Sequence, residues 1–277
     1  MNRLWIGLII ALIGFLMYMF QTQENPVTHK RQHVKISPDQ EIRLGLQAAP
    51  MMSQKMGGEV NRNDPRSIEV SRIGQFLVSH TEAKGSPWKF RFHLLADPKT
   101  INAFALPGGQ IFITLGLYNK LQNEAQLAGV LGHEMGHVIE RHTAEQMAKS
   151  NLGQMLIMAV GASTQNPQGT NYSPMLLASV VNNMFQLHYS RQDESEADIW
   201  GVKFMEEAGY NPKAMIQVLE ILKGAGGSGR TPEIFQTHPN PDLRIQQIEA
   251  YFKEHPPKAN LSMGNSLGQH KNPIQPH

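Results

Sequence analysis

Apolar residues recur every three or four positions along most of the chain between residues 37 and 255, which is the spacing of helices with one buried face. This pattern predicts helices that begin near residues 37, 67, 123, 151, 175, 190, 211 and 241. The first also carries a capping sequence, because Ser37 precedes Pro38 and Gln40 stands at the third helical position. The chain is therefore expected to be mainly helical.

Three short stretches show the pattern that is typical of strands. Residues 88–94 alternate apolar and polar side chains, which predicts a strand with one face toward solvent. Residues 102–106 and 110–114 flank a Pro-Gly-Gly turn and are expected to pair as a hairpin. We therefore expect an α+β fold, mainly helical with a small sheet, in one domain that spans residues 37–255.

The N-terminal residues predict a membrane anchor at residues 1–20. An uninterrupted run of 17 apolar or glycine residues extends from Leu4 to Phe20, with Trp5 and Tyr18 near its ends. A helix of this length is about 25 Å long, the lower limit for crossing a bilayer, and aromatic residues favour the interfaces. A cleaved signal segment is the alternative, although no small-residue cleavage site follows the run. Arg3 favours a cytoplasmic N-terminus, with the rest of the chain outside the cytoplasm.

The composition indicates the character of the two remaining segments and excludes some classes of function. Residues 21–36 are polar without hydrophobic period and are expected to form a tether, whereas residues 256–277 are rich in Pro, Asn and Gly and are expected to be disordered. The net charge is only +2 and there is no basic run with interleaved aromatic residues, which argues against nucleic acid as a partner. The absence of cysteine excludes disulfides, thiolate metal sites and a cysteine nucleophile.

The helix that begins near residue 123 contains the sequence His133-Glu134-Met135-Gly136-His137. Two histidines four residues apart lie on one helix face, so both imidazoles can bind one metal ion, and Glu134 can take a proton from a metal-activated water. The flanking positions are largely apolar, which indicates a buried helix. A buried helix that keeps two histidines and a glutamate indicates a metal site rather than a solvated surface.

Other nearby side chains are not expected to be ligands. A metzincin needs a glycine and a third histidine at positions that here hold Glu140 and Thr143, so that type of site is excluded and His142 with it. Glu140 lies about 10 Å along the helix from His133, too far to complete a site with both histidines. His93 lies on the polar face of the first strand and is expected to be exposed.

Two carboxylates on the helix near residue 190 are expected to face inward. They belong to a stripe at helical spacing that consists of Glu194, Ala197, Asp198, Gly201 and Met205. The small residues of the stripe permit close approach of another helix, and buried carboxylates need a cation or hydrogen-bond donors. Asp193 and Glu196, in contrast, are explained by the preference of acidic side chains for a helix N-terminus.

These side chains together indicate a catalytic zinc site. We expect His133, His137 and Glu194 to bind the metal, with the fourth position left for water. Asp198 can accept the second ring N–H of His133 and fix its orientation. Glu134 is the expected general base, which takes the proton of the water and delivers it to the leaving amine. Another divalent ion remains an alternative to zinc.

Four stretches of the sequence together resemble the M48 family of zinc metallopeptidases. They are residues 102–109, 133–137 and 194–198, and His238-Pro239 with Arg244. They occur in the order of the family and cover roughly residues 37–253. The resemblance implies a zincin-like fold of the gluzincin type, in which the H-E-x-x-H helix packs against the helix that carries Glu194.

The resemblance also assigns roles outside the metal ligands. It implies that the strand formed by Asn102, Ala103, Phe104 and Ala105 lines the cleft and pairs with an extended substrate. It places His238 and Arg244 near the metal. His238 could stabilise the oxyanion, occupy the fourth metal position and block water, or cap the last helix. Arg244 could be catalytic or an ordinary solvated helix residue.

The expected function is that of a zinc endopeptidase, with one zinc ion per chain. The single apolar run departs from the multi-span prenyl-protein proteases of the family and is closer to single-anchor bacterial members, which implies quality control of unfolded or misassembled envelope proteins. The expected location is the bacterial inner membrane with the catalytic domain in the periplasm, or the soluble periplasm if the N-terminal segment is cleaved. Envelope assembly machinery is a possible partner. The alternative is a chaperone or assembly factor that zinc stabilises and whose protease activity is latched or minor.

Overall fold

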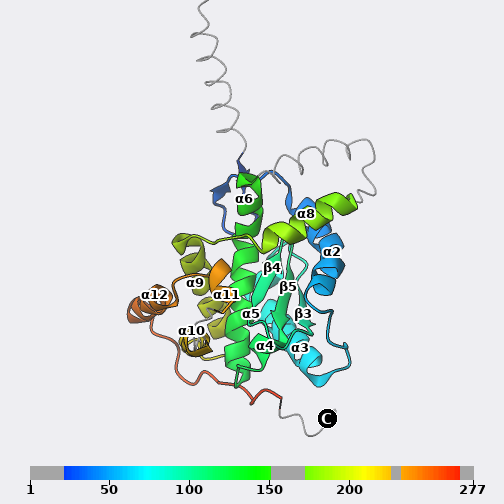
Figure 1. Cartoon of the computed structure of the whole chain (residues 1–277). Coiled ribbons are helices and arrows are strands. Elements are labelled where there is room, and N and C mark those ends of the chain that lie inside the picture. Colours follow the sequence, from blue (N-terminus) through cyan, green and yellow to red (C-terminus); the bar gives the residue numbers. More distant parts are fainter. Residues whose placement is uncertain (1–21, 151–171, 226–231, 269–277) are drawn as a thin grey trace, which may run out of the picture.

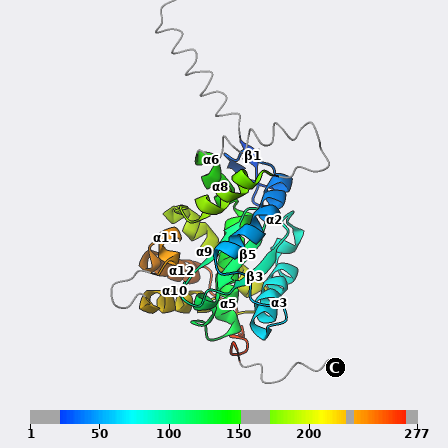
Figure 2. The same cartoon turned by 45° about the vertical axis from the view of Figure 1, so that its right-hand side comes forward.

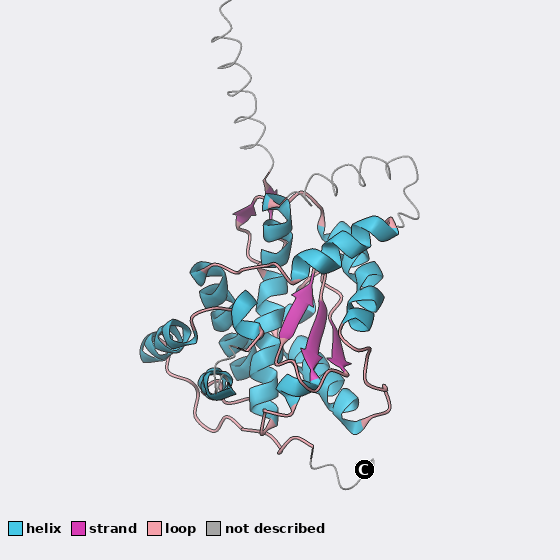
Figure 3. Cartoon of the chain, in the orientation of Figure 1, coloured by secondary structure: helices cyan, strands magenta, loops and turns pink. Residues whose placement is uncertain are grey.

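The computed structural model describes residues 22–150, 172–225 and 232–268. Its central sheet has three strands: β3 (Arg91–Leu95), β4 (Ala103–Leu106) and β5 (Gln110–Thr114). Their order is β3-β5-β4, so β5 is central, and Figure 3 shows this sheet surrounded by helices. β4 pairs with β5 in antiparallel fashion, which confirms the predicted hairpin, whereas β3 runs parallel to β5.

Helices cover both faces of the sheet because successive strand residues point to opposite sides. Ala103, Ala105 and Ile111 belong to a core shared with α5 (Glu124–Ile139) and α3 (Pro65–His80). Phe104 and Phe112 belong to a second core shared with α2 (Pro38–Lys55) and α8 (Pro174–Met184). The capping box at Ser37 and Gln40 that begins α2 confirms that prediction.

The remaining described helices complete the domain. They are η1 (Glu82–Gly85, a 3₁₀ helix), α4 (Leu115–Tyr118), α6 (His142–Lys149), α9 (Arg191–Glu207), α10 (Ala214–Ala225), α11 (Ile234–Thr237) and α12 (Pro241–Glu254). Helices α9, α10 and α12 lie on the side of α5 away from α2 and α3 (Figures 1 and 2). The helix expected from residue 151 lies outside the described residues. The predicted mainly helical α+β fold is confirmed.

Helices α5 and α9 approach each other unusually closely. A Cβ atom added to Gly136 would lie 2.8 Å from the carbonyl oxygen of Ala197, and one added to Gly132 would lie 3.2 Å from Cα of Gly201. The small residues of the predicted stripe are buried at this contact. The close approach brings the histidine-bearing face of α5 against the acidic face of α9.

The segment that precedes α2 packs against the domain, although a polar tether was expected. A short hairpin, β1 (Gln23–Glu24) and β2 (Arg31–Gln32), sits over the C-terminal end of α5. The side chain of Asn25 donates to the carbonyl of Ile139 over 2.8 Å, and that of Gln32 donates to the carbonyl of Glu140. These bonds satisfy carbonyl groups that a helix end leaves free, and hydrophobic periodicity does not reveal them.

Part of the expected disordered tail is also bound to the domain. In the described residues 256–268, the carbonyl groups of Met263 and Asn265 accept hydrogen bonds from the N–H groups of Ala125 and Glu124, over 3.0 and 2.9 Å. The first N–H groups of a helix have no partner within it, so this segment caps the N-terminal end of α5. Residues 269–277 lie outside the described part.

The expected anchor between Leu4 and Phe20 lies outside the described residues. Within the described ranges, none of the helices combines the length and the apolar character needed to cross a membrane.

Candidate active site and metal centre

Helix α5 carries two histidines of the expected metal site on one face. The Nε2 atoms of His133 and His137 lie 3.0 Å apart, and both rings are buried. Helix α9 adds Glu194, whose Oε1 lies 3.4 Å from Nε2 of His137 and whose Oε2 lies 3.7 Å from Nε2 of His133. The structure therefore brings together the three side chains that the sequence pattern assigned to the metal.

His238, just after α11, is the fourth side chain of this cluster. Its Nδ1 atom lies 2.9 Å from Oε1 of Glu194 and 3.3 Å from Nε2 of His133, and the residue is 1% exposed. The residue that caps α12 is Asn240, in a left-handed conformation with φ of 60°, so the helix-cap interpretation of His238 is wrong.

The spacing of these donor atoms fits a metal ion. One ligand atom from each of His133, His137, Glu194 and His238 lies within 4.8 Å of all the others. Four ligands at about 2.0–2.1 Å from a tetrahedral ion are separated from one another by roughly 3.3 Å, and the observed separations scatter about that value. Three imidazole nitrogens that converge on one point also cannot all be satisfied by one another, whereas a cation satisfies all three.

The general-base candidate, Glu134, lies beside this cluster. It is 1% exposed, its Oε1 lies 3.7 Å from Nε2 of His238, and its Oε2 has no hydrogen-bond partner among the described residues. Burial raises its pKa, although the nearby His238 and His133 oppose this. Burial also lowers the pKa of His137 well below its usual value, which favours the neutral imidazole that binds metals.

Arg244 organises the two inward carboxylates of α9. Its Nε and Nη2 atoms donate to the two carboxylate oxygens of Asp198 over 2.8 and 2.6 Å, and its Nη1 lies 2.8 Å from Oε2 of Glu194. Burial raises the pKa of Glu194, but the charges of His238 and Arg244 outweigh it and hold that pKa well below its usual value. Arg244 is 5% exposed, so its interpretation as a solvated helix residue is wrong.

The outer nitrogen atoms of the two α5 histidines have different partners. Oδ1 of Asp198 lies 2.9 Å from Nδ1 of His133, the contact expected from the sequence. Nδ1 of His137 lies 2.9 Å from Nδ1 of His142, a contact that the sequence pattern did not indicate. The turn that brings His142 back to His137 is made at Arg141, whose φ of 58° is left-handed. A left-handed residue other than glycine is uncommon, so the sequence gives little sign of this turn.

Two further side chains of this region were not anticipated. Oε2 of Glu196 lies 3.2 Å from Nε2 of His142. Glu196 therefore has a specific partner, in addition to the general preference of acidic residues for a helix start. This hydrogen bond contributes most to lowering the pKa of Glu196 to about 2. The ring of Tyr189 stacks on His137 with 4.0 Å between ring centroids, and its hydroxyl lies 3.0 Å from Oγ1 of Thr143.

The strand expected to pair with substrate is β4, an edge strand next to α5. Its expected contact residues are all buried: Asn102 (4% exposed), Ala103 (0%), Phe104 (7%) and Ala105 (0%). The carbonyl of Ile101 accepts a hydrogen bond from the N–H of Ile234 over 3.2 Å. The short helix α11 therefore covers the start of β4 and leads directly into His238.

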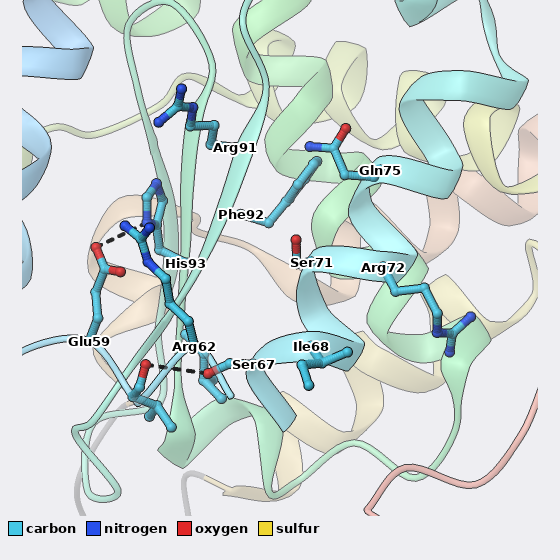
Figure 4. A pocket seen from close by; sticks show the side chains of 12 residues that line it. Glu59, Arg62, Ser67, Ile68, Ser71, Arg72, Gln75, Arg91, Phe92 and His93 are labelled. Carbon is cyan, nitrogen blue, oxygen red and sulfur yellow. Dashed lines mark hydrogen bonds and ion pairs between the residues drawn. The ribbon is translucent and has the colours of Figure 1, made fainter. Parts of the chain in front are cut away.

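A groove lies along the opposite edge strand, β3, and is lined by none of these site residues. It has a volume of about 470 Å³, and Arg62, Arg72 and Arg91 line it together with residues of α3 (Figure 4). His93 lies in its wall, where Nδ1 is 3.0 Å from Oε1 of Glu59 and the side chain is 12% exposed. The expectation of a solvent-exposed His93 is therefore wrong.

A buried H-E-x-x-H helix joined to a glutamate of a second helix defines this protein as a metalloendopeptidase with a zincin-like fold. The model of peptidase family M48 matches residues 65–252, and the chain belongs to this family.

Curated relatives agree with this assignment. The chain is similar to the mitochondrial metalloendopeptidase OMA1 of Schizosaccharomyces pombe, with 30% identity over 253 residues that cover 90% of this chain and 72% of that protein. It is also similar to the beta-barrel assembly-enhancing protease of Escherichia coli, with 35% identity over 191 residues, 66% of this chain and 38% of that protein. The chain thus spans well under half the length of the bacterial relative.

Proposed function

We propose that this protein is a zinc-dependent endopeptidase that hydrolyses unfolded or misassembled proteins of the bacterial cell envelope. The observation that carries the proposal is the convergence of His133, His137 and Glu194 with Glu134 buried beside them. The similarity to a protease named for enhancing beta-barrel assembly supports envelope proteins as the substrate class.

Each of these residues has a distinct role in the proposed reaction. His133, His137 and Glu194 hold zinc, which when bound supplies a Lewis acid that polarises the scissile carbonyl and acidifies water. Glu134 accepts the proton of the attacking water and passes it to the leaving amine, and its burial strengthens it as a base. Asp198 accepts the Nδ1–H of His133, so that Nε2 of this ring is free to bind the metal.

Replacement of Glu134 tests the mechanism. Glu134→Gln keeps the shape of the side chain but removes the base, so we expect full zinc content and a loss of cleavage of about 10²–10⁴-fold. Elemental analysis and the cleavage of a labelled unfolded protein measure the two properties. Glu206→Gln, on the distant part of α9, is the matched control and should cleave normally. Wild-type cleavage by a pure Glu134→Gln preparation contradicts the mechanism.

We further propose that His238 latches the site in the described conformation. Its Nδ1 atom stands at the distances of a fourth ligand, the position that a catalytic zinc site keeps open for water. The same segment is bound next to the start of β4, because the N–H of Ile234 donates to the carbonyl of Ile101. Movement of residues 234–238 would therefore open the metal and expose β4, including Asn102 to Ala105, to pair with an extended substrate.

The latch makes a prediction that separates it from the oxyanion role. If His238 blocks water, His238→Ala should cleave an unfolded substrate several-fold faster than the wild type, whereas loss of an oxyanion donor costs about 10²–10³-fold. The initial cleavage rate at saturating zinc is the measurement. A rate equal to or below that of the wild type argues against the latch.

An assembly factor is the second candidate function, and the closed four-ligand cluster favours it because structural zinc sites are closed. Here zinc would stabilise the fold while protease activity stays minor. In a strain that lacks the gene, Glu134→Gln should then restore growth as well as the wild type does. Failure of this rescue assigns the phenotype to proteolysis.

We propose that the protein sits in the inner membrane through residues 1–20, with its catalytic domain in the periplasm. The apolar run from Leu4 to Phe20 supports this location. N-terminal sequencing of the mature protein distinguishes an anchor from a cleaved signal segment, which would leave the domain soluble in the periplasm.

A further inference from the structure

A chain of four side chains links the first β-hairpin to the metal centre. It runs from Lys30, next to β2, to Glu196 on α9, to His142 at the start of α6, and to His137 on α5. The separations are 3.1 Å from Lys30 Nζ to Glu196 Oε1, 3.2 Å from Glu196 Oε2 to His142 Nε2, and 2.9 Å between the Nδ1 atoms of His142 and His137. His137 and His142 are 0% and 3% exposed.

The protons in this chain have one consistent arrangement. Nε2 of His137 faces the other ligand atoms and must be unprotonated to bind a metal, so the ring proton is on Nδ1. That proton can be donated to His142 only if Nδ1 of His142 is an acceptor, which puts the proton of His142 on Nε2. Nε2–H in turn donates to the carboxylate of Glu196, and every donor meets an acceptor.

We propose that His142 is a positioning residue of the metal centre: it accepts the Nδ1–H of His137, and Glu196 with Lys30 fixes the tautomer in which it can do so. A metal-bound histidine usually donates its second ring N–H to a carboxylate, carbonyl or water, and Asp198 is such a partner for His133. For His137, a neutral imidazole backed by a carboxylate fills the same place. The inference rests on the proposed role of His137 as a ligand.

The carboxylates around His142 already have a cation. Nζ of Lys30 lies 3.1 Å from both carboxylate oxygens of Glu140 and 3.1 Å from Glu196. Nε1 of Trp200 donates to Oε1 of Glu140 over 2.7 Å. With an ammonium group bound between Glu140 and Glu196, this cluster orients His142 rather than holding a second metal ion.

Cobalt binding provides a test that does not depend on activity. Loss of a partner of a metal-bound histidine typically weakens metal affinity by about 10–100-fold, so His142→Ala should bind Co²⁺ that much more weakly and shift its visible absorption bands. His142→Asn places an amide oxygen near the position of Nδ1 and should recover most of the affinity and the spectrum. Chelator competition gives the affinities, and thermal unfolding of the metal-free forms controls for a change in the fold.

Neutralising Glu196 tests the outer part of the chain should His142→Ala not fold. The side chain of Glu196 is 26% exposed, and Glu196→Gln should weaken Co²⁺ binding, whereas Glu207→Gln at the far end of α9 should not. Wild-type affinity and spectrum in His142→Ala, or equal affinities in the two glutamine variants, overturns the inference. Unchanged Co²⁺ binding in His137→Ala would instead contradict the proposed ligand set itself.

Discussion

The two histidines of α5 belong to the same cluster but have different partners at their outer ring nitrogen atoms. His133 meets the charged carboxylate of Asp198, which Arg244 holds through two hydrogen bonds. His137 meets the imidazole of His142 on one side and the ring of Tyr189 on one face. The outer sides of the two rings are therefore oriented by separate sets of contacts.

The sequence indicated the side chains that converge at the candidate metal site better than the side chains that support them. The H-E-x-x-H spacing and the acidic stripe of α9 pointed to residues that the structure brings together, because helical periodicity fixes which side chains share a face. The metzincin spacing argued against His142 as a third ligand, and its contact with His137 depends on the left-handed turn at Arg141, between α5 and α6. A left-handed turn at a non-glycine residue is uncommon, so it depends on contacts elsewhere in the fold and not on the local sequence.

Asp64, the residue that caps α3, should make the free energy of unfolding depend on pH. It accepts hydrogen bonds from the main-chain N–H and the side chain of Arg66, which lower its pKa to about 2. The pKa of Asp64 is lower in the folded protein than the unfolded value of about 3.9. The ionised side chain therefore stabilises the fold above pH 3.9, and this stabilisation is lost as the pH falls toward 2.

Asp64→Asn keeps a capping side chain but removes the charge that pairs with Arg66, so it should lower the free energy of unfolding by about 0.5 kcal/mol at pH 7 and by progressively less below pH 4. Urea unfolding of both proteins across this pH range measures the difference. A gap that is constant with pH, or that widens in acid, contradicts the assignment.

At the scale of elements, the sheet and the α5–α9 pair determine where the site forms. The hairpin of β4 and β5 was predictable from its turn sequence, whereas the parallel pairing of β3 with β5 joins strands that no short turn connects. The contact of α5 with α9 was predictable from small residues at helical spacing. Its closeness follows from the missing side chain at Gly136.

Gly136→Ala tests this contact. The added Cβ would lie 2.8 and 2.9 Å from main-chain atoms of Ala197, so the helices must separate. We expect a loss of about 1–3 kcal/mol in the free energy of unfolding, together with weaker zinc binding.

Gly129→Ala is the matched control on the same helix. There the nearest atom to the added Cβ is the flexible side-chain sulfur of Met205 at 3.4 Å. This substitution should be neutral or stabilising by up to about 1 kcal/mol, because alanine favours helix. Equal denaturant midpoints for the two variants contradict the interpretation of the α5–α9 contact.

At the scale of the whole molecule, the metal cluster joins α5, α9 and the segment after α11. The composition of residues 21–36 and 256–277 predicted a tether and a disordered tail. The described residues of both regions instead bind main-chain groups at the two ends of α5. Contacts of this kind follow no hydrophobic period, so composition alone could not identify them.

Metal removal should accordingly destabilise the domain as a whole. With zinc at a thousand times its dissociation constant, binding to the folded state contributes about 4 kcal/mol, which EDTA should remove. Thermal unfolding of Glu134→Gln, used to avoid self-cleavage, measures the effect. EDTA saturated with zinc beforehand is the control, and an unchanged midpoint in free EDTA would show that the metal does not join these elements.

The capping of α5 by residues 263 and 265 has a consequence for biosynthesis. A ribosome delivers the H-E-x-x-H residues well before Glu194, His238 and this capping segment, so a nascent chain carries Glu134 long before the remaining side chains of the cluster. The site would thus become complete only after residues 263 and 265 have left the ribosome and capped α5.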